Sequence, residues 1–72
     1  MEFRLTWHAY QAMRRRNISR GALETVIAQA DSIEIGPTAV IYDGDVDGRP
    51  LRVVMTRGAS PALVITVHER DR

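Results

Sequence analysis

The stretch TWHAYQAMRRRNISRGALETVI, residues 6–27, decides how the N-terminal part of this chain folds. It predicts two short helices, His8–Arg16 and Arg20–Ala30, which meet at a tight corner. Thr6 and Ser19 are common N-cap residues, because their side-chain oxygen accepts a hydrogen bond from a free amide of the first helical turn. Each of them therefore marks the start of a helix.

The corner between the two helices is specified by its own residues. Asn17 stands where the first helix must stop, and Asn tolerates the left-handed conformation of a C-terminal cap. Ile18 and Leu23 flank Ser19 at the spacing of a hydrophobic staple, which fixes the angle at which the chain enters the second helix. The second helix has the i, i+3, i+4, i+7 apolar pattern of a core-facing face, formed by Leu23, Val26, Ile27 and Ala30. Because it turns this face to the core, it is not expected to be a DNA-recognition helix.

Beyond Asp31 the apolar period changes to two, which is typical of strands. Residues 1–5 are expected to form an extended lead, and the predicted strands cover residues 33–35, 39–43, 51–57 and 62–69. The connections are short, which favours an antiparallel meander, and Asp47-Gly48 is a good hairpin turn. The predicted fold class is α+β, with two N-terminal helices packed on one face of an antiparallel sheet of three to four strands.

Alternation along the last two strands assigns their faces. Leu51, Val53 and Met55 are expected to face the helices, and so are Leu63, Ile65 and Val67. The opposite, outer face would then carry Arg52, Thr56, Thr66 and His68, with Tyr42 beside them if Ile41 points inward. We expect the large aromatic residues Trp7 and Phe3 to be buried, because so small a domain needs them for its core.

Length and composition narrow the class of protein. With 72 residues, the chain is expected to be a single domain over residues 1–72, and the absence of cysteine excludes disulfides and thiolate metal sites. Two histidines and few clustered carboxylates predict no metal site, and we expect no cofactor. There is no apolar run long enough to span a bilayer and no signal-peptide pattern, so we expect a cytoplasmic protein with no membrane partner.

The charges are segregated along the chain although the net charge is only +1. Residues 1–23 contain five Arg and one acid, residues 24–47 contain six acids and no base, and residues 48–72 contain five Arg and two acids. If the helices and the last strands lie together, they would form a basic face, which is typical of proteins that bind an anionic partner such as RNA. All ten basic residues are Arg, which suits phosphate binding but also follows from a coding sequence rich in G and C.

Three segments together resemble a known family. They are residues 8–19 with His8-Ala9, Met13, Arg16 and Ile18-Ser19, residues 47–54 (DGRPLRVV) and residues 64–70 (VITVHER). This pattern resembles the small bacterial domain-of-unknown-function family 4258, which is grouped with the RelE and barnase-like nuclease fold. Ala12 and Asn17 stand where family members often carry Arg and Gly. The resemblance implies two helices before an antiparallel sheet, and a relation to mRNA-cleaving toxins that are paired with antitoxins.

Metal-independent RNA cleavage by the neighbouring 2′-hydroxyl needs one group to remove a proton and one to return it. His8 is the candidate base, because the positive end of the helix dipole favours its neutral form. His68 is the second candidate proton carrier, and Tyr42 is a weaker candidate for proton transfer or stacking. A structural alternative stands beside each histidine: His8 closes the start of the helix onto the sheet edge, and His68 is a solvated strand residue.

Cations must stabilise the charge that develops on the phosphate during cleavage. Arg16, Arg52 and Arg70 are the candidate phosphate-binding residues of the catalytic site, and Arg14 and Arg15 are candidates for contacts with the RNA backbone. The alternatives are structural here too. Arg16 complements the dipole at a helix C-terminus, Arg52 is an exposed strand charge, and Arg70 belongs to a frayed tail.

The leading hypothesis from the sequence is a toxin-like, metal-independent endoribonuclease of a bacterial toxin–antitoxin system. Its partners would be mRNA, free or on the ribosome, and a cognate antitoxin protein. The alternative is a domain that binds RNA or a protein but has lost its active site. A third hypothesis is a structural homodimer formed through the sheet edges.

Overall fold

The corner that the sequence predicts between the two helices is present in the computed structural model, which describes residues 2–70. Helix α1 (Trp7–Arg16) and helix α2 (Arg20–Ala28) are joined by Asn17, which adopts the left-handed conformation with φ 54° and ψ 49°. The amide of Ile18 then donates to the Met13 carbonyl at 2.9 Å, which closes the end of α1. The C-terminal cap is therefore confirmed.

Both predicted N-caps are also confirmed. The Thr6 hydroxyl accepts a hydrogen bond from the Ala9 amide at 3.1 Å, and the Ser19 hydroxyl accepts one from the Ala22 amide at 3.0 Å. Each bond satisfies an amide that would otherwise have no partner within its helix.

Replacing Ser19 by alanine is expected to lower the free energy of unfolding by about 1 kcal/mol, because the Ala22 amide loses its acceptor. Urea denaturation followed by circular dichroism measures the change. Ser32→Ala, at an exposed position in the sheet, is the matched control and should change stability by less than about 0.5 kcal/mol. Equal losses in the two variants would contradict the role of Ser19 as a cap.

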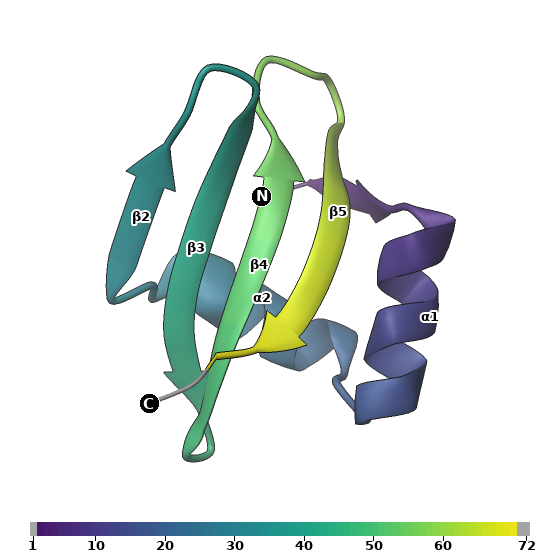
Figure 1. The fold of residues 1–72 in the computed structure, drawn as a ribbon, viewed down its shortest axis with the longest axis vertical. Helices are drawn as coiled ribbons and strands as arrows, with labels where there is room; N and C mark the ends of the chain where they lie inside the picture. Colours follow the sequence, from purple (N-terminus) through teal and green to yellow (C-terminus); the bar gives the residue numbers. More distant parts are fainter. Residues whose placement is uncertain (1, 71–72) are drawn as a thin grey trace.

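The strands form one five-stranded sheet in the order β1-β5-β4-β3-β2 (Figure 1). Their bounds are β1 (Phe3–Leu5), β2 (Ser32–Ile35), β3 (Ala39–Val46), β4 (Arg49–Thr56) and β5 (Ala62–Glu69). Strands β2 to β5 are antiparallel neighbours, whereas β1 runs parallel to β5. The α+β class is confirmed, and the prediction of a purely antiparallel sheet of three to four strands is corrected to a mixed sheet of five. Of the extended lead predicted for residues 1–5, Met1 lies outside the described residues.

Strand β1 is held to β5 through Thr6, the N-cap residue of α1. The Thr6 amide donates to the Val64 carbonyl at 3.1 Å, and the Thr6 hydroxyl lies 3.0 Å from that oxygen and 3.2 Å from the Ile65 carbonyl oxygen. Thr6 therefore caps α1 and also anchors it to β5. A strand of three residues is too short to show a period in the sequence, so this parallel pairing was not predicted.

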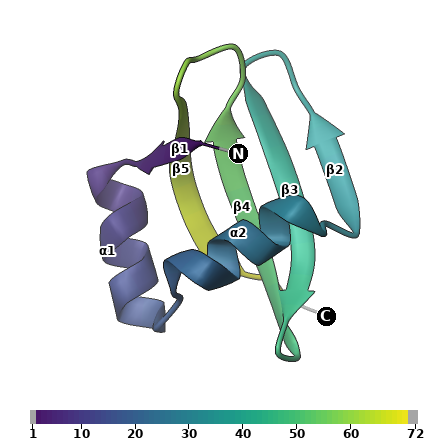
Figure 2. The ribbon, with the colours of Figure 1, turned by 180° about the vertical axis from the view of Figure 1, so that it is seen from behind.

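Helix α2 crosses the back of β3 and β4, whereas α1 lies beside β5 at the edge where β1 ends (Figure 2). In the part of the chain that the structure describes, the opposite face of the sheet carries no helix (Figure 1). The core between α2 and the sheet contains the fully buried side chains of Leu23, Val26, Leu51, Val53 and Met55. The Asp47-Gly48 turn is confirmed, with φ values of 52° and 81°, and it joins β3 directly to β4.

A bulge in β5 changes which side chains face the core. Val54 pairs with Thr66, but the next residue of β4, Met55, pairs with Val64, so Ile65 has no partner. One extra residue shifts the alternation by one position. Val64 and Val67 are consequently both fully buried, while Leu63 and Ile65 are each 37% exposed. The prediction that Leu63 and Ile65 face the core is therefore wrong, whereas Val67 is confirmed.

Of the two aromatic residues that were expected in the core, one is buried and the other is exposed. Phe3 is 3% exposed, as predicted, and packs in the core cluster. Trp7 is 70% exposed, so the prediction that it is buried is wrong. It occupies the first position of α1, and the buried residues of that helix are Ala9, Ala12 and Met13.

Candidate functional site on the open face of the sheet

Three polar residues lie in a row across the middle of the sheet. Asp43 in β3 is the partner of Arg52 in β4, and Arg52 is the partner of His68 in β5. Their neighbours Leu51, Val53 and Val67 are buried toward the helices. Because side chains alternate between the two faces of a strand, the row lies on the face that carries no helix.

The centre of this row is a bidentate ion pair. Arg52 donates from Nε to Asp43 Oδ1 at 2.8 Å and from Nη2 to Oδ2 at 2.9 Å. The Asp43 side chain is only 12% exposed, whereas that of Arg52 is 40% exposed. The hydrogen bonds from Arg52 hold the pKa of the Asp43 carboxyl below its ordinary value of 3.8, and Asp43 in turn raises the pKa of Arg52. This pair uses two of the five donors of Arg52, so three remain for another acceptor.

Arg70 reaches the same carboxylate from the segment that follows β5. Its backbone amide donates to the Pro50 carbonyl at 2.8 Å, which keeps this end of the chain against β4. Its Nε lies 3.8 Å from Asp43 Oδ1, and its Nη2 lies 3.5 Å from Asp45 Oδ1. The buried Nε has no hydrogen-bond partner among the described residues. Arg70 is thus held mainly by charge rather than by well-directed hydrogen bonds.

A pocket of about 370 Å³ opens between these residues, lined by Arg52, His68, Glu69 and Arg70. His68 is half-buried, and its positive form would contribute to lowering the pKa of Asp43. The carboxylate of Glu69 pairs with Arg49 at 3.2 Å. We call Asp43, Asp45, Arg52, His68 and Arg70 the outer-face cluster. It offers guanidinium donors for an anion and an imidazole for proton transfer.

The outer-face cluster should make stability depend on acid. Because the pKa of Asp43 is lowered by folding, its contribution is present at neutral pH and is lost as the pH falls below about 4. Asp43→Asn is expected to lower the free energy of unfolding at pH 7 by about 1–2 kcal/mol, less than for a fully buried pair, because Arg52 can reach water. The difference between the variant and the parent should shrink at lower pH.

Urea denaturation of both proteins at neutral and acidic pH measures this effect. Asp47→Asn is the matched control, since Asn tolerates the positive φ of the turn and Asp47 forms no ion pair in the part of the chain that the structure describes. A difference between Asp43→Asn and the parent that stays constant with pH would contradict the assignment.

The structure brings together three of the residues that the sequence suggested for catalysis: Arg52, His68 and Arg70. It places Tyr42 elsewhere. Tyr42 pairs with Val53 and packs against the core on the helix side, while Ile41 pairs with Val54 on the outer face. Because Ile41 does not point inward, the condition under which Tyr42 was expected beside Arg52 is not met.

The other suggested residues lie on α1, outside the pocket. His8, Arg14, Arg15 and Arg16 are all exposed. The carbonyl of Arg16 accepts a hydrogen bond from Arg49 Nη2 at 2.8 Å, so a cation from β4 satisfies the end of this helix. No hydrogen bond within residues 2–70 joins these four side chains to the outer-face cluster.

Sequence reasoning missed the acidic half of the site. The strand predicted over residues 39–43 stopped short of Asp45, whereas β3 in fact continues to Val46. The ion pair could have been predicted from the two-residue turn Asp47-Gly48. This turn fixes the register of the hairpin, and the register sets Asp43 opposite Arg52. An acid directly opposite an arginine predicts a cross-strand ion pair.

The model of one protein family, described as Domain of unknown function (DUF4258), matches residues 5–69. The chain belongs to this family. The matched region of the DUF4258 domain contains both helices and every residue of the outer-face cluster except Arg70. Searches of curated proteins and of solved structures find no match for this chain.

Two further findings concern the classes of protein considered from the sequence. Within residues 2–70, neither helix has the length and apolar character that crossing a bilayer requires. Over the same residues, no group of three or more His, Cys, Asp or Glu is placed to hold a metal ion.

Proposed function

We propose that this chain is a RelE-type domain that cleaves mRNA without a metal ion, as the toxin of a bacterial toxin–antitoxin pair acting in the cytoplasm. The observation that carries the proposal is the convergence of Arg52, His68 and Arg70 on one open pocket. The order of elements, with two helices before the antiparallel strands β2–β5, supports the relation to that nuclease fold.

In this proposal the cations bind the scissile phosphate. The bidentate contact with Asp43 fixes the plane of the Arg52 guanidinium and leaves its remaining donors directed outward. Arg70 contacts Asp45 at 3.5 Å, which is longer than a strong charge-assisted hydrogen bond, so a phosphate oxygen can compete for it. Such preorganised cations stabilise the negative charge that grows on the phosphate oxygens in the transition state.

In this proposal, the imidazoles of His68 and His8 carry out the two proton transfers of the cleavage reaction. One base removes the proton of the 2′-hydroxyl, whose oxygen then attacks phosphorus, and the bond to the 5′-oxygen breaks as that oxygen takes up a proton. We assign one of these transfers to His68 in the pocket. The other is assigned to His8, which is exposed at the start of α1, the helix that packs beside β5. The products would be a 2′,3′-cyclic phosphate and a free 5′-hydroxyl.

The experiment is to incubate the purified protein with an mRNA, alone and on ribosomes, in the presence of EDTA. Cleavage is expected, and it should stop where a 2′-deoxynucleotide replaces the nucleotide before the cut. RNA that stays intact both alone and on ribosomes would refute the enzyme.

A domain that binds RNA or a protein without cleaving it is the second candidate. It is favoured by the charge balance of the outer-face cluster, in which two arginines face two aspartates, so the pocket carries little net charge when His68 is neutral. Saturable binding of an RNA that remains intact would select this candidate.

The homodimer hypothesis concerns β2, which lies at one edge of the sheet and pairs only with β3. On this strand Ile33 and Ile35 are 54% and 64% exposed. An open strand edge with apolar side chains is a site where another chain can pair. Sizing over a range of concentrations, with Ile33→Lys as the variant that should prevent association, tests this hypothesis.

A further inference from the structure

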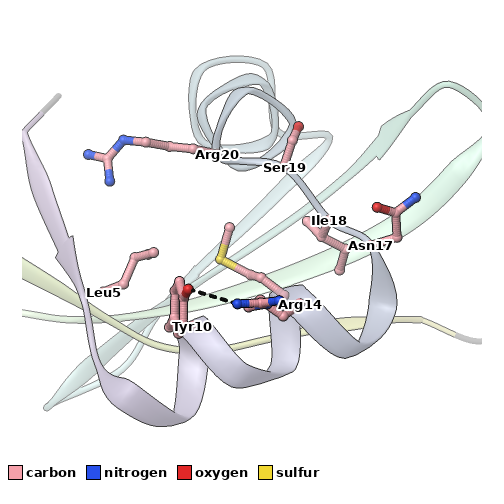
Figure 3. Close-up of a pocket in the computed structure, with 8 residues that line it drawn as sticks. Leu5, Tyr10, Arg14, Asn17, Ile18, Ser19 and Arg20 are labelled. Carbon is pink, nitrogen blue, oxygen red and sulfur yellow. Dashed lines mark hydrogen bonds between the residues drawn. The ribbon is translucent and has the colours of Figure 1, made fainter.

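Helix α1 carries a column of stacked side chains on its exposed side. Trp7, Tyr10 and Arg14 follow the i, i+3, i+7 spacing that places residues along one helix face. The rings of Trp7 and Tyr10 are stacked, with centroids 5.5 Å apart and planes 25° apart. The Arg14 guanidinium carbon lies 5.9 Å from the centre of the Tyr10 ring, and Nη1 donates to the Tyr10 hydroxyl at 3.3 Å (Figure 3). We call these three residues the α1 column.

The end of the α1 column is open to solvent. Trp7 is 70% exposed and Tyr10 is 40% exposed, although the helix already buries Ala9, Ala12 and Met13 against the rest of the fold. Packing therefore does not account for a tryptophan at this position. Large aromatic side chains that are exposed and already stacked offer a flat surface to another flat group.

Tyr10 and Arg14 of the α1 column line two pockets that contain cations. The pocket on one side, of about 310 Å³, is lined by Gln11 and Arg15 together with the column. The other pocket, of about 470 Å³, is also lined by Arg20 at the start of α2, whose side chain extends away from Tyr10 (Figure 3) and donates to the Phe3 carbonyl at 3.2 Å. Among residues 2–70, neither pocket has an acidic lining residue.

The charge of this surface differs from that of the outer-face cluster. Asp43 and Asp45 pair with the arginines of the cluster, but no ion pair among residues 2–70 involves Arg14 or Arg15. Helix α1 itself contains no acidic residue. The α1 column is therefore a stacking surface beside unpaired positive charge, which is the combination that binds unpaired nucleotides.

We propose that the α1 column binds single-stranded nucleic acid, with a base stacked on the free face of Trp7 and the adjoining phosphates held by Arg14 and Arg15. The partner belongs to the same class as in the proposed function, but the binding requires neither the pocket nor cleavage. In this proposal, α1 binds an unpaired nucleic-acid strand beside β5. Every base has a flat face, so the site should bind with little sequence preference.

The test uses the fact that Trp7 is the only tryptophan of the chain. A short oligothymidylate is the probe, because it lacks 2′-hydroxyls and the proposed cleavage cannot act on it. Titration should quench the fluorescence of Trp7 until the site is saturated, and the affinity should fall steeply with salt. Blunt duplex DNA with the same number of phosphates should quench far less, because its bases are already stacked.

Substitutions then separate stacking from charge. By anisotropy of a labelled oligothymidylate, Trp7→Ala should weaken binding by about 5- to 100-fold, and Trp7→Phe should retain part of the affinity. Arg15→Gln should lower the slope of log affinity against log salt by about 0.7. Arg57→Gln is the control, because it removes a cation that directly follows β4. The loss of affinity caused by Trp7→Ala should be the same with and without this substitution. Thermal melts of each variant confirm that it is folded.

Several results would overturn the proposal: no quenching by oligothymidylate, equal affinity of Trp7→Ala and the parent, or equal quenching by a polyglutamate peptide, which would identify an acidic protein partner. Fluorescence that shifts with protein concentration alone would assign Trp7 to contacts between copies of the chain. Failure here is separable from failure of the proposed function. Cleavage of mRNA without quenching refutes only the α1 column, and quenching without cleavage refutes only the nuclease.

Discussion

Replacing His68 by alanine is expected to lower the rate of RNA cleavage by about 10²- to 10⁴-fold, the usual contribution of a positioned acid or base. His68 is half-buried in the pocket beside Arg52, so its removal takes away the proton carrier closest to the proposed phosphate site. The rate should be measured at saturating RNA with a labelled substrate.

Thr66→Ala is the matched control for this variant. Thr66 lies two residues before His68 on the same strand, and pairs with Val54 on the outer face, so its loss tests general damage to the strand. His8→Ala should lower the rate by a comparable factor if His8 is the second proton carrier. Cleavage by His68→Ala at the same rate as Thr66→Ala would remove His68 from the mechanism.

Replacing Leu23 by alanine is expected to lower the free energy of unfolding by about 2–5 kcal/mol. Leu23 is fully buried, and it joins the corner after α1 to the core between α2 and the sheet. A domain of 72 residues has a total stability of roughly 4–11 kcal/mol, so this single cavity would remove a large part of it. The melting temperature should fall by about 10–30 °C.

Thermal and urea denaturation of Leu23→Ala, beside Ile35→Ala, tests this expectation. Ile35 is an aliphatic residue of the same size but is 64% exposed, so its loss should change stability by less than about 0.5 kcal/mol. If the two variants proved equally stable, Leu23 would not have the central place in the core that its burial indicates.

The sequence predicted the parts of the fold that are specified by neighbouring residues. Thr6, Asn17 and Ser19 act through hydrogen bonds within one helical turn, and Asp47-Gly48 sets its turn through its own backbone angles. Such signals do not depend on the rest of the chain. The helix starts, the end of α1 and the tight hairpin could therefore be predicted before any tertiary contact was known, whereas α2 ends at Ala28, two residues before the predicted end at Ala30.

The features that were missed depend on distant partners. The short strand β1 forms only because β5 offers it an edge, and Ile65 becomes exposed only because a bulge lengthens β5 relative to β4. From the sequence, the face of Tyr42 could be given only relative to that of Ile41. The pairing of β3 with β4 decides which face each of the two residues takes. None of these choices leaves a period or a cap in the sequence.

The candidate site, like the fold, could be predicted from the sequence only in part. Arg52, His68 and Arg70 were suggested by their residue types and by the alternation of two strands, and the structure gathers them in one pocket. Asp43 was missed because its importance comes from the residue opposite it on another strand. Trp7 was misplaced because size alone argued for burial, whereas the face of α1 that meets the core begins at Ala9.

The parallel pairing of β1 with β5 has a consequence for how the protein is made. Phe3 pairs with Ala62 and Leu5 pairs with Val64, so the first strand of this domain can pair only after β5, the last strand of the domain, has been synthesised. Contacts of such wide sequence separation form late and slow folding, because a long loop must close first. During synthesis, helices α1 and α2 can form early, but the sheet that anchors them stays incomplete. The domain should therefore gain its native form only after β5 has left the exit tunnel.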